Sequence, residues 1–249
     1  MINNQFYTAI STPRFNRYLV ACNYHQRRAE MLYRINLRLS QKMYSVIGLF
    51  EIILRNSIDR HFTSIKGPPW LEEAVLPNGY LDMSADCEHA FHSVQETIYK
   101  LGLSYTHDSL IATLTFGFWT HQFSKMEYAA AGSTLLQIFP NRPPGTHQKD
   151  IFKNLVRIND TRNRIAHYEP ICFEKSTGRI SSTPIQKRYA LIIEMLHWLG
   201  CNPKKILYGI DGVQRAIHEL NNAISPSPST HSPTILPSQP APLSAHNAH

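Results

Sequence analysis

A long helical pattern of apolar residues at positions 40–62 constrains the fold more than any other feature of the sequence. Its apolar side chains recur at the three- and four-residue spacing that gathers them on one wide face of an α-helix. They are Val46, Ile47, Phe50, Leu54, Ile58 and Phe62. The period-two alternation typical of half-buried strands is scarce throughout the chain. The sequence therefore predicts an all-α helical bundle.

Similar helical patterns fill most of the chain on both sides of this segment. They cover residues 15–39, 84–101, 110–122, 148–167 and 185–199, and a last helix is predicted to start near Asp211. Residues 1–15 are polar and lack periodicity, so we expect a flexible N-terminus before a helical domain at 16–222. From Ala223 onward Ser, Pro, Thr and His dominate. Such a segment buries too little apolar surface to order itself, which predicts a disordered tail over 223–249.

Composition favours a cytoplasmic protein with no membrane partner. At 249 residues, 43% of them hydrophobic, the chain is long enough to bury a core without disulfides. No run approaches the roughly 18–20 apolar residues of a membrane span, and the N-terminus lacks the pattern of a signal peptide. The cysteines stand singly, without a C-x-x-C pair, and are interpreted as ordinary cytosolic thiols: Cys22, Cys87, Cys172 and Cys201.

The charge balance favours a polyanionic partner. The net charge is +7 and the sequence pI is about 9.3, which is typical of proteins that bind nucleic acid, although many soluble proteins are mildly basic. Four arginines decorate the polar side of the pattern at 15–39: Arg27, Arg28, Arg34 and Arg38. They form either a solvated helix face or a rim that faces RNA.

The segment at 159–170 concentrates cations, amides and one histidine at the end of a helical pattern. Its buried stripe is predicted from Ile151, Leu155, Ile158 and Ile165. Arg162 falls in line with that stripe, so it lies either at the rim of the core or in a cleft. A neighbouring face carries a polar residue every four positions: Asn159, Asn163 and His167. Pro170 disfavours helical geometry before it, so we expect the helix to end close to His167.

The chemistry of this segment fits cleavage of a phosphodiester. The chain has no G-x-x-x-x-G-K, H-E-x-x-H or G-x-S-x-G motif, and neither a cofactor nor a metal is predicted. Histidine transfers protons near neutral pH, and arginine binds phosphate oxygens as a fork, so Arg162 and His167 are candidate catalytic residues with Asn163 beside them. The flanking cations are candidate RNA contacts: Lys149, Lys153, Arg157 and Arg164.

One histidine per chain supplies one proton-transfer group, so a symmetric homodimer would complete such a site. The structural alternative treats Arg162 as a cation favoured by the helix dipole and His167 as a capping residue. Both interpretations stay open on spacing alone.

A second polar segment lies within the apolar pattern at 40–62. Glu51 and Arg55 are four residues apart in the order that favours an ion pair along a helix, and Asn56 follows. These residues either line the cleft of Arg162 or brace its helix. Phe116-Gly117-Phe118-Trp119 is interpreted as core or a subunit contact, with base stacking as the alternative.

Several of these segments resemble one family in the same order. Arg162-Asn163-Arg164-Ile165-Ala166-His167 resembles the R-x-x-x-x-H motif of HEPN-superfamily ribonucleases. The pattern around Glu51, Trp70-Leu71, the Phe116 block and the segment through Pro170 resemble the Abi-like abortive-infection proteins of the AbiD/AbiF type, over about residues 20–220. The resemblance implies a HEPN-like bundle with additional helices, usually dimeric, with a metal-independent ribonuclease site.

The same resemblance implies a role in bacterial antiphage defence, with RNA as substrate and toxin–antitoxin behaviour, including a possible antitoxin partner. It gives Asn163 a role in orienting the phosphate, and Tyr168 and Glu169 a role in positioning His167. Two other functions stay open. One is a non-catalytic RNA-binding protein that holds a structured small RNA. The other is a helical interaction domain, which is favoured if Arg162 and His167 are buried and paired internally.

Overall fold

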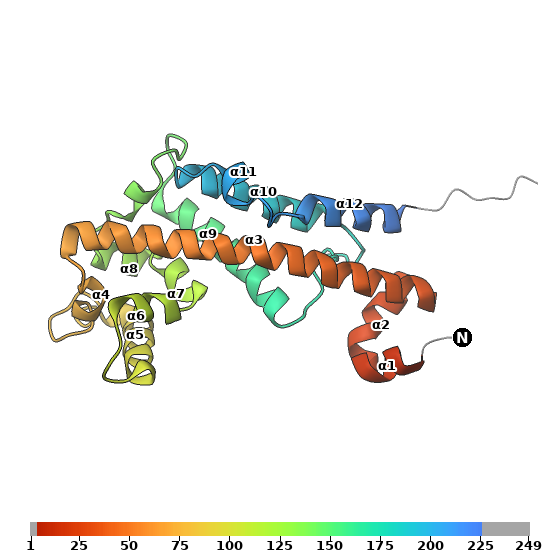
Figure 1. Cartoon of the computed structure of the whole chain (residues 1–249), viewed down its shortest axis with the longest axis horizontal. Helices are drawn as coiled ribbons and strands as arrows, with labels where there is room; N and C mark the ends of the chain where they lie inside the picture. Colours follow the sequence, from red (N-terminus) through yellow and green to blue (C-terminus); the bar gives the residue numbers. More distant parts are fainter. Residues whose placement is uncertain (1–3, 226–249) are drawn as a thin grey trace, which may run out of the picture.

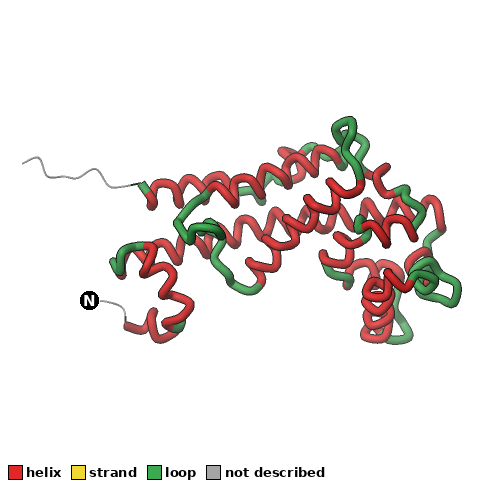
Figure 2. Tube along the Cα trace, turned by 180° about the vertical axis from the view of Figure 1, so that it is seen from behind, coloured by secondary structure: helices red, strands yellow, loops and turns green. Residues whose placement is uncertain are grey.

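The computed structural model describes residues 4–225, and they form an all-α protein, as the sequence predicts. Helices in red make up most of the trace in Figure 2, and within the described range the one β-contact is an isolated bridge between Phe173 and Ile180. In chain order the elements are α1 (Asn4–Ile10), α2 (Thr12–Ala21), α3 (Gln26–Lys66), α4 (Trp70–Glu73), η1 (Ala85–Cys87), α5 (Glu88–Leu101), α6 (His107–Thr113), α7 (Phe116–His121), α8 (Lys125–Ala130), η2 (Leu135–Ile138), α9 (Gln148–Ala166), α10 (Thr183–Trp198), α11 (Pro203–Ile206) and α12 (Val213–Ile224).

Helix α3 is the axis of the molecule. It has 41 residues and is therefore about 60 Å long at 1.5 Å per residue. It runs the length of the body, with α1 and α2 at one end and α4, α5 and α6 at the other, while α9, α10 and α12 pack along it (Figure 1). The apolar face predicted at 40–62 is fully buried from Val46 to Phe62. The core of the domain therefore forms around this helix.

The predicted helix boundary within this axis was wrong. The apolar spacing predicted one helix over 15–39 and a new one from Ser40, whereas in the structure α2 ends at Ala21 and α3 runs unbroken from Gln26. The break lies at Asn23 and Tyr24, whose φ angles are 51° and 59°. Left-handed geometry at two consecutive residues ends a helix without a glycine or proline, so the apolar spacing across the turn concealed it.

The prediction of one helix at 110–122 was also wrong. The structure has α6 and α7 with Leu114 and Thr115 extended between them. The hydroxyl of Thr115 accepts a hydrogen bond from the amide of Phe118 at 3.3 Å, which caps α7 and favours a fresh start there. The predicted starts of α9 at Gln148 and of the following helix near Ile185 are confirmed within two residues.

The structure describes much of the N-terminal segment but little of the C-terminal one. Within the predicted flexible segment at 1–15, α1 and the first turn of α2 are helical, and Phe6 packs edge-to-face on Phe15 and Tyr33. Most of the predicted disordered tail lies outside the described residues, and Ala223 and Ile224 complete α12. None of the described helices has both the length and the apolar character needed to cross a membrane.

Candidate functional site

Helix α9 carries the R-x-x-x-x-H segment against the core. The predicted stripe of Ile151, Leu155, Ile158 and Ile165 is buried, which confirms the helical register. Helix α7 lies close to it, because Gly117 faces Asn159: a Cβ placed on Gly117 would lie 3.7 Å from the amide nitrogen of that side chain. Phe116, Phe118 and Trp119 are buried, so this block belongs to the core, and base stacking by its rings is excluded.

Arg162 lies partly buried between α9 and α3, in the position that the stripe predicted. Its Nε atom is buried and has no hydrogen-bond partner. Among the described residues its guanidinium makes no ion pair within 4 Å, and its one hydrogen bond is a long contact of 3.5 Å to the side-chain oxygen of Asn163. A buried donor without a partner costs about 1–3 kcal/mol. The fold therefore holds Arg162 at this position while few intramolecular interactions occupy its guanidinium.

Glu51 on α3 is the acidic neighbour of Arg162. Burial raises the pKa of the Glu51 carboxyl, and the positive charges of Arg162 and Arg55 oppose that rise. These couplings place the three side chains in one electrostatic group, although two helices supply them. The structure thus brings together the two motifs that lie more than a hundred residues apart in sequence.

The predicted ion pair between Glu51 and Arg55 does not form. The guanidinium of Arg55 instead donates to the carbonyl of Ala112 at 3.2 Å and to the side-chain oxygen of Asn56 at 3.4 Å. Ala112 lies in the last turn of α6, where carbonyl groups lack helical partners and the helix dipole attracts a cation. This tertiary contact outcompetes the local pair. Arg55 therefore braces α6 against α3, while Asn56 is exposed beside it.

The end of α9 is a tight helix-stopping turn. The amide of Tyr168 donates to the carbonyl of Ile165 at 3.0 Å, and the amide of Glu169 donates to that of Arg164 at 2.8 Å. These two bonds define a Schellman motif, whose left-handed residue is usually glycine. Here Tyr168 takes that place, with φ at 57°. His167 is the C-cap residue, as expected, and its exposed side chain has no hydrogen bond or ion pair with any described residue.

Arg164 and Asn36 hold this turn in place. The guanidinium of Arg164 binds the carboxylate of Glu169 at 3.3 Å and also donates to the carbonyl of Pro170. Asn36, 3% exposed on α3, accepts hydrogen bonds from the amides of Ile171 at 2.9 Å and Cys172 at 3.2 Å. Sequence reasoning missed Asn36. The available signal was a lone amide inside the apolar stripe of α3, because a buried amide needs partners from elsewhere.

The predicted RNA contacts divide into two groups. Lys149, Lys153 and Arg157 are exposed and recur every four residues, so they share one face of α9. Arg164 is only partly exposed and its guanidinium is engaged within the turn, so the structure gives it a positioning role instead.

Further cations that were not predicted gather at this end of the molecule. Arg188 of α10 is half-buried and donates to the hydroxyl of Thr161 at 3.0 Å. Burial and the nearby charges of Arg157 and Arg164 lower its pKa. From α2, Arg14 lies over the ring of Tyr168 at 5.9 Å and Arg17 over that of Phe173 at 4.5 Å. Three helices thus contribute cations to this part of the molecule, and a concentration of positive charge attracts polyanions.

The arginines on the first half of α3 are less available. Arg34 pairs with Glu30 at 2.7 Å, and Arg38 pairs with Glu219 of α12. Arg27 and Arg28 are exposed. The interpretation as a solvated helix face therefore holds for the paired arginines.

The sequence matches no protein-family profile, and comparisons with curated proteins and with solved structures found no match. Across residues 4–225 no group of three or more histidine, cysteine or acidic side chains is placed to hold a metal ion. The four cysteines are free thiols, and three of them are buried.

Proposed function

We propose that this protein is a metal-independent RNA endonuclease of the HEPN type that acts in bacterial antiphage defence. The proposal rests on the burial and hydrogen bonding of the two motif residues, Arg162 and His167. Arg162 has a buried Nε without a partner, and His167 is exposed and unbonded within the described chain. Neither side chain forms an ion pair within the described residues, so neither fits the expectation of a buried, internally paired group. The alternative of a helical interaction domain loses its main condition for this reason.

The arrangement offers several of the groups that RNA cleavage needs. His167 would take the proton of the 2′-hydroxyl, or give one to the leaving 5′-oxygen, since imidazole exchanges protons near neutral pH. Arg162 would bind the phosphate oxygens and stabilise the charge that develops on the phosphorane. Asn163, exposed beside Arg162, would orient the phosphate. Lys149, Lys153 and Arg157 would hold the flanking backbone.

A second copy of the chain would supply the missing proton-transfer group. Helix α3 leaves an apolar stripe exposed beside the end of α9, with Leu37, Tyr44 and Ile52 in line. Gly48 lies in the same line, and a Cβ added there would meet nothing within 4 Å. Leu37 and Tyr44 also line a groove of about 400 Å³ together with Ala166 and Tyr168. A two-fold contact on this face would bring two His167 side chains near each other.

The test is incubation of the purified protein with a mixed RNA pool in EDTA, followed by analysis of the product ends. We expect 2′,3′-cyclic phosphate and 5′-hydroxyl ends from the wild type. His167→Ala and Arg162→Ala should each lower the cleavage rate by about 100-fold or more. His218→Ala, which removes an exposed histidine of α12, should cleave like the wild type. Cleavage that survives both motif substitutions would refute the assignment.

A non-catalytic RNA-binding protein is the second candidate, and the cations around Arg188 favour it. It predicts strongly salt-dependent RNA binding without cleavage products, because bound cations release counterions from the phosphates. A combined form is compatible with the same surface, in which a bound small RNA acts as antitoxin and restrains the nuclease. RNA retention by wild type and His167→Ala alike, with no products from either, would support binding alone.

A further inference from the structure

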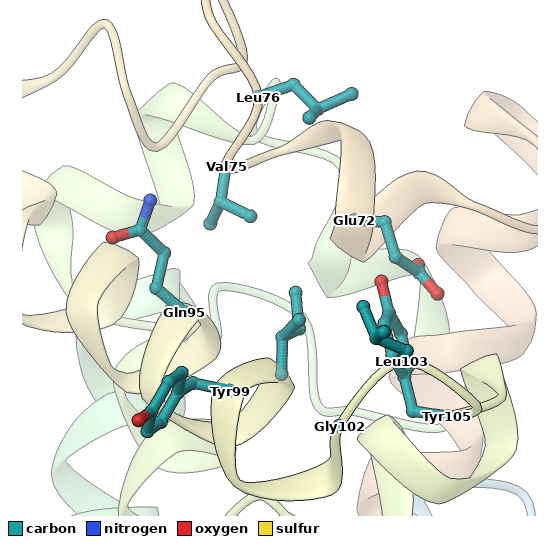
Figure 3. Close-up of a pocket in the computed structure, with 9 residues that line it drawn as sticks. Glu72, Val75, Leu76, Gln95, Tyr99, Gly102, Leu103 and Tyr105 are labelled. Carbon is teal, nitrogen blue, oxygen red and sulfur yellow. The ribbon is translucent and has the colours of Figure 1, made fainter.

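A pocket of about 690 Å³ lies far from the motif, at the end of the molecule built by α4, α5 and α6. In Figure 3 its side chains ring a space between α4 and α5 and the loop that follows α5. Most of the wall is apolar, and Leu76, Tyr99 and Leu103 are more than half exposed. This volume is typical of pockets that hold small molecules. Large exposed apolar side chains gathered at one hollow indicate a binding site.

One carboxylate stands in this wall, and it belongs to a hydrogen-bonded chain. Glu72 accepts from Nδ1 of His107 at 3.0 Å, and Nε2 of His107 donates to Asp59 of α3 at 2.8 Å. Both ring nitrogens therefore face carboxylates, so the imidazole is a doubly protonated cation. Burial lowers the pKa of His107, but the hydrogen bonds to Asp59 and Glu72 together raise it by more. The net result is a pKa above the usual value of histidine.

The charges of this chain do not cancel. Two carboxylates share one imidazolium, which leaves one negative charge. Asp59 has additional donors, since the indole nitrogen of Trp70 lies 2.9 Å from it and the hydroxyl of Thr63 lies at 3.4 Å. Glu72 faces the pocket, where burial and its negative charge raise the pKa of the neighbouring Tyr105. No lysine or arginine lines the pocket. The uncompensated negative charge therefore lies on Glu72 and faces the ligand that the pocket would bind.

The segment around the pocket adds further negative charge. Residues 68–111 hold seven acidic residues and a single lysine, Lys100, in a chain whose net charge is +7. This lobe repels RNA and attracts cations.

We propose that the pocket binds an organic cation, an amine or guanidinium carried on an apolar body. The charged head would pair with Glu72, and the body would lie against Val75, Ile98 and Leu103. The exposed ring of Tyr99 offers a face on which a cation is also stabilised. This site is independent of the proposed nuclease, since none of its residues belongs to the α9 motif.

The test uses three probes that share one body: 4-phenylbutylamine, 4-phenylbutanol and 4-phenylbutanoic acid. Binding to the full chain is followed by calorimetry. We expect saturable binding of the amine, about 10-fold weaker binding of the alcohol and none of the acid, because a half-buried carboxylate discriminates by charge. Equal affinity for amine and alcohol, or no saturable binding of the amine, would overturn the proposal.

A matched pair of variants tests whether the negative charge of Glu72 binds the amine, and a third variant tests the pocket itself. Glu72→Gln should abolish the preference for the amine over the alcohol, and Glu73→Gln, an exposed neighbour with the same charge change, should preserve it. Leu103→Lys changes an exposed rim residue, so it leaves the fold intact even if Glu72→Gln does not. It should place a cation of the chain itself at the pocket and remove amine binding. Amine binding that persists in Leu103→Lys would exclude this pocket as the site.

Discussion

The lobe of α4 to α6 and the end of α9 each contain a histidine near charged groups, and the two are held in opposite ways. His107 is clamped through both ring nitrogens by carboxylates from α3 and α4. His167 caps a helix through its backbone, and its side chain is exposed and unbonded among the described residues. A clamped imidazole has both ring nitrogens engaged in the fold, whereas a free one is available to a substrate. Residue type alone therefore does not distinguish a histidine that is held within the fold from one whose side chain is free to contact a substrate.

The two regions also differ in charge. Arg14 of α2 and Arg164 of α9 lie at the turn after His167, and Arg188 of α10 lies near Arg164, while the segment at the other end of α3 is acidic. Asn36 of α3 binds the turn and Asp59 of α3 binds His107, and these two residues lie about 35 Å apart along the helix at 1.5 Å per residue. One molecule can then offer separate surfaces for a polyanion and for a cation. The following experiments test that separation, in order of decreasing expected effect.

Asn36→Ala should destabilise the end of α9 most. The substitution leaves the buried amides of Ile171 and Cys172 without an acceptor, so we expect a loss of about 3 kcal/mol in the free energy of unfolding. Denaturant melts measure it, and Asn163→Ala, at an exposed amide on α9, is the control that should change stability little. A loss below about 1 kcal/mol would mean that Asn36 does not hold the turn.

His107→Ala and His167→Ala should differ clearly in their effect on stability. His107→Ala leaves the carboxylates of Asp59 and Glu72 facing each other without a cation, so unfolding should become easier by about 2 kcal/mol. His167→Ala should alter stability by less than about 0.5 kcal/mol, since its side chain is exposed. Paired urea melts of the two variants give this contrast. Equal effects would contradict the comparison.

The stability contributed by His107 should depend on pH in a defined direction. Its folded pKa lies above its usual value, so the folded state holds the proton more tightly than the unfolded chain. The contribution is complete below the unfolded pKa of about 6.5 and disappears as pH rises through the folded value. Urea melts of wild type and His107→Gln from pH 5 to 9 should show a gap that narrows with rising pH. A gap that widens would reverse the assigned charge.

Tyr168→Gly should have the smallest effect, and it should stabilise the protein. A left-handed tyrosine costs about 1 kcal/mol more than a glycine at the same place, partly offset by the greater flexibility of unfolded glycine. We expect a gain of about 0.5 kcal/mol in thermal or urea melts. Gly48→Ala on α3 is a useful companion, since its Cβ has open space in the monomer. Destabilisation by Tyr168→Gly would show that contacts of the ring, including Arg14, outweigh the strain.

Much of the site was predictable because it follows from helical spacing. The stripe of α9, the place of Arg162 within it and the end of the helix at His167 were all read from residues close in sequence. The ion pair of Glu51 with Arg55 followed the same local rule and was wrong. A carbonyl of α6 attracts Arg55 more strongly, and that carbonyl is 57 residues away. Local rules fail where a distant group offers a better partner.

The sequence by itself determined the all-α class, the buried faces of α3 and α9 and the identity of the polar residues at the helix end. These depend on periodicity, which neighbouring residues set. Only the tertiary structure decided which polar groups come together: Glu51 near the charge of Arg162, His107 with two carboxylates, and Asn36 with the turn after α9. Such partners come from different helices, and the packing of the core, rather than any local pattern, fixes how those helices face one another.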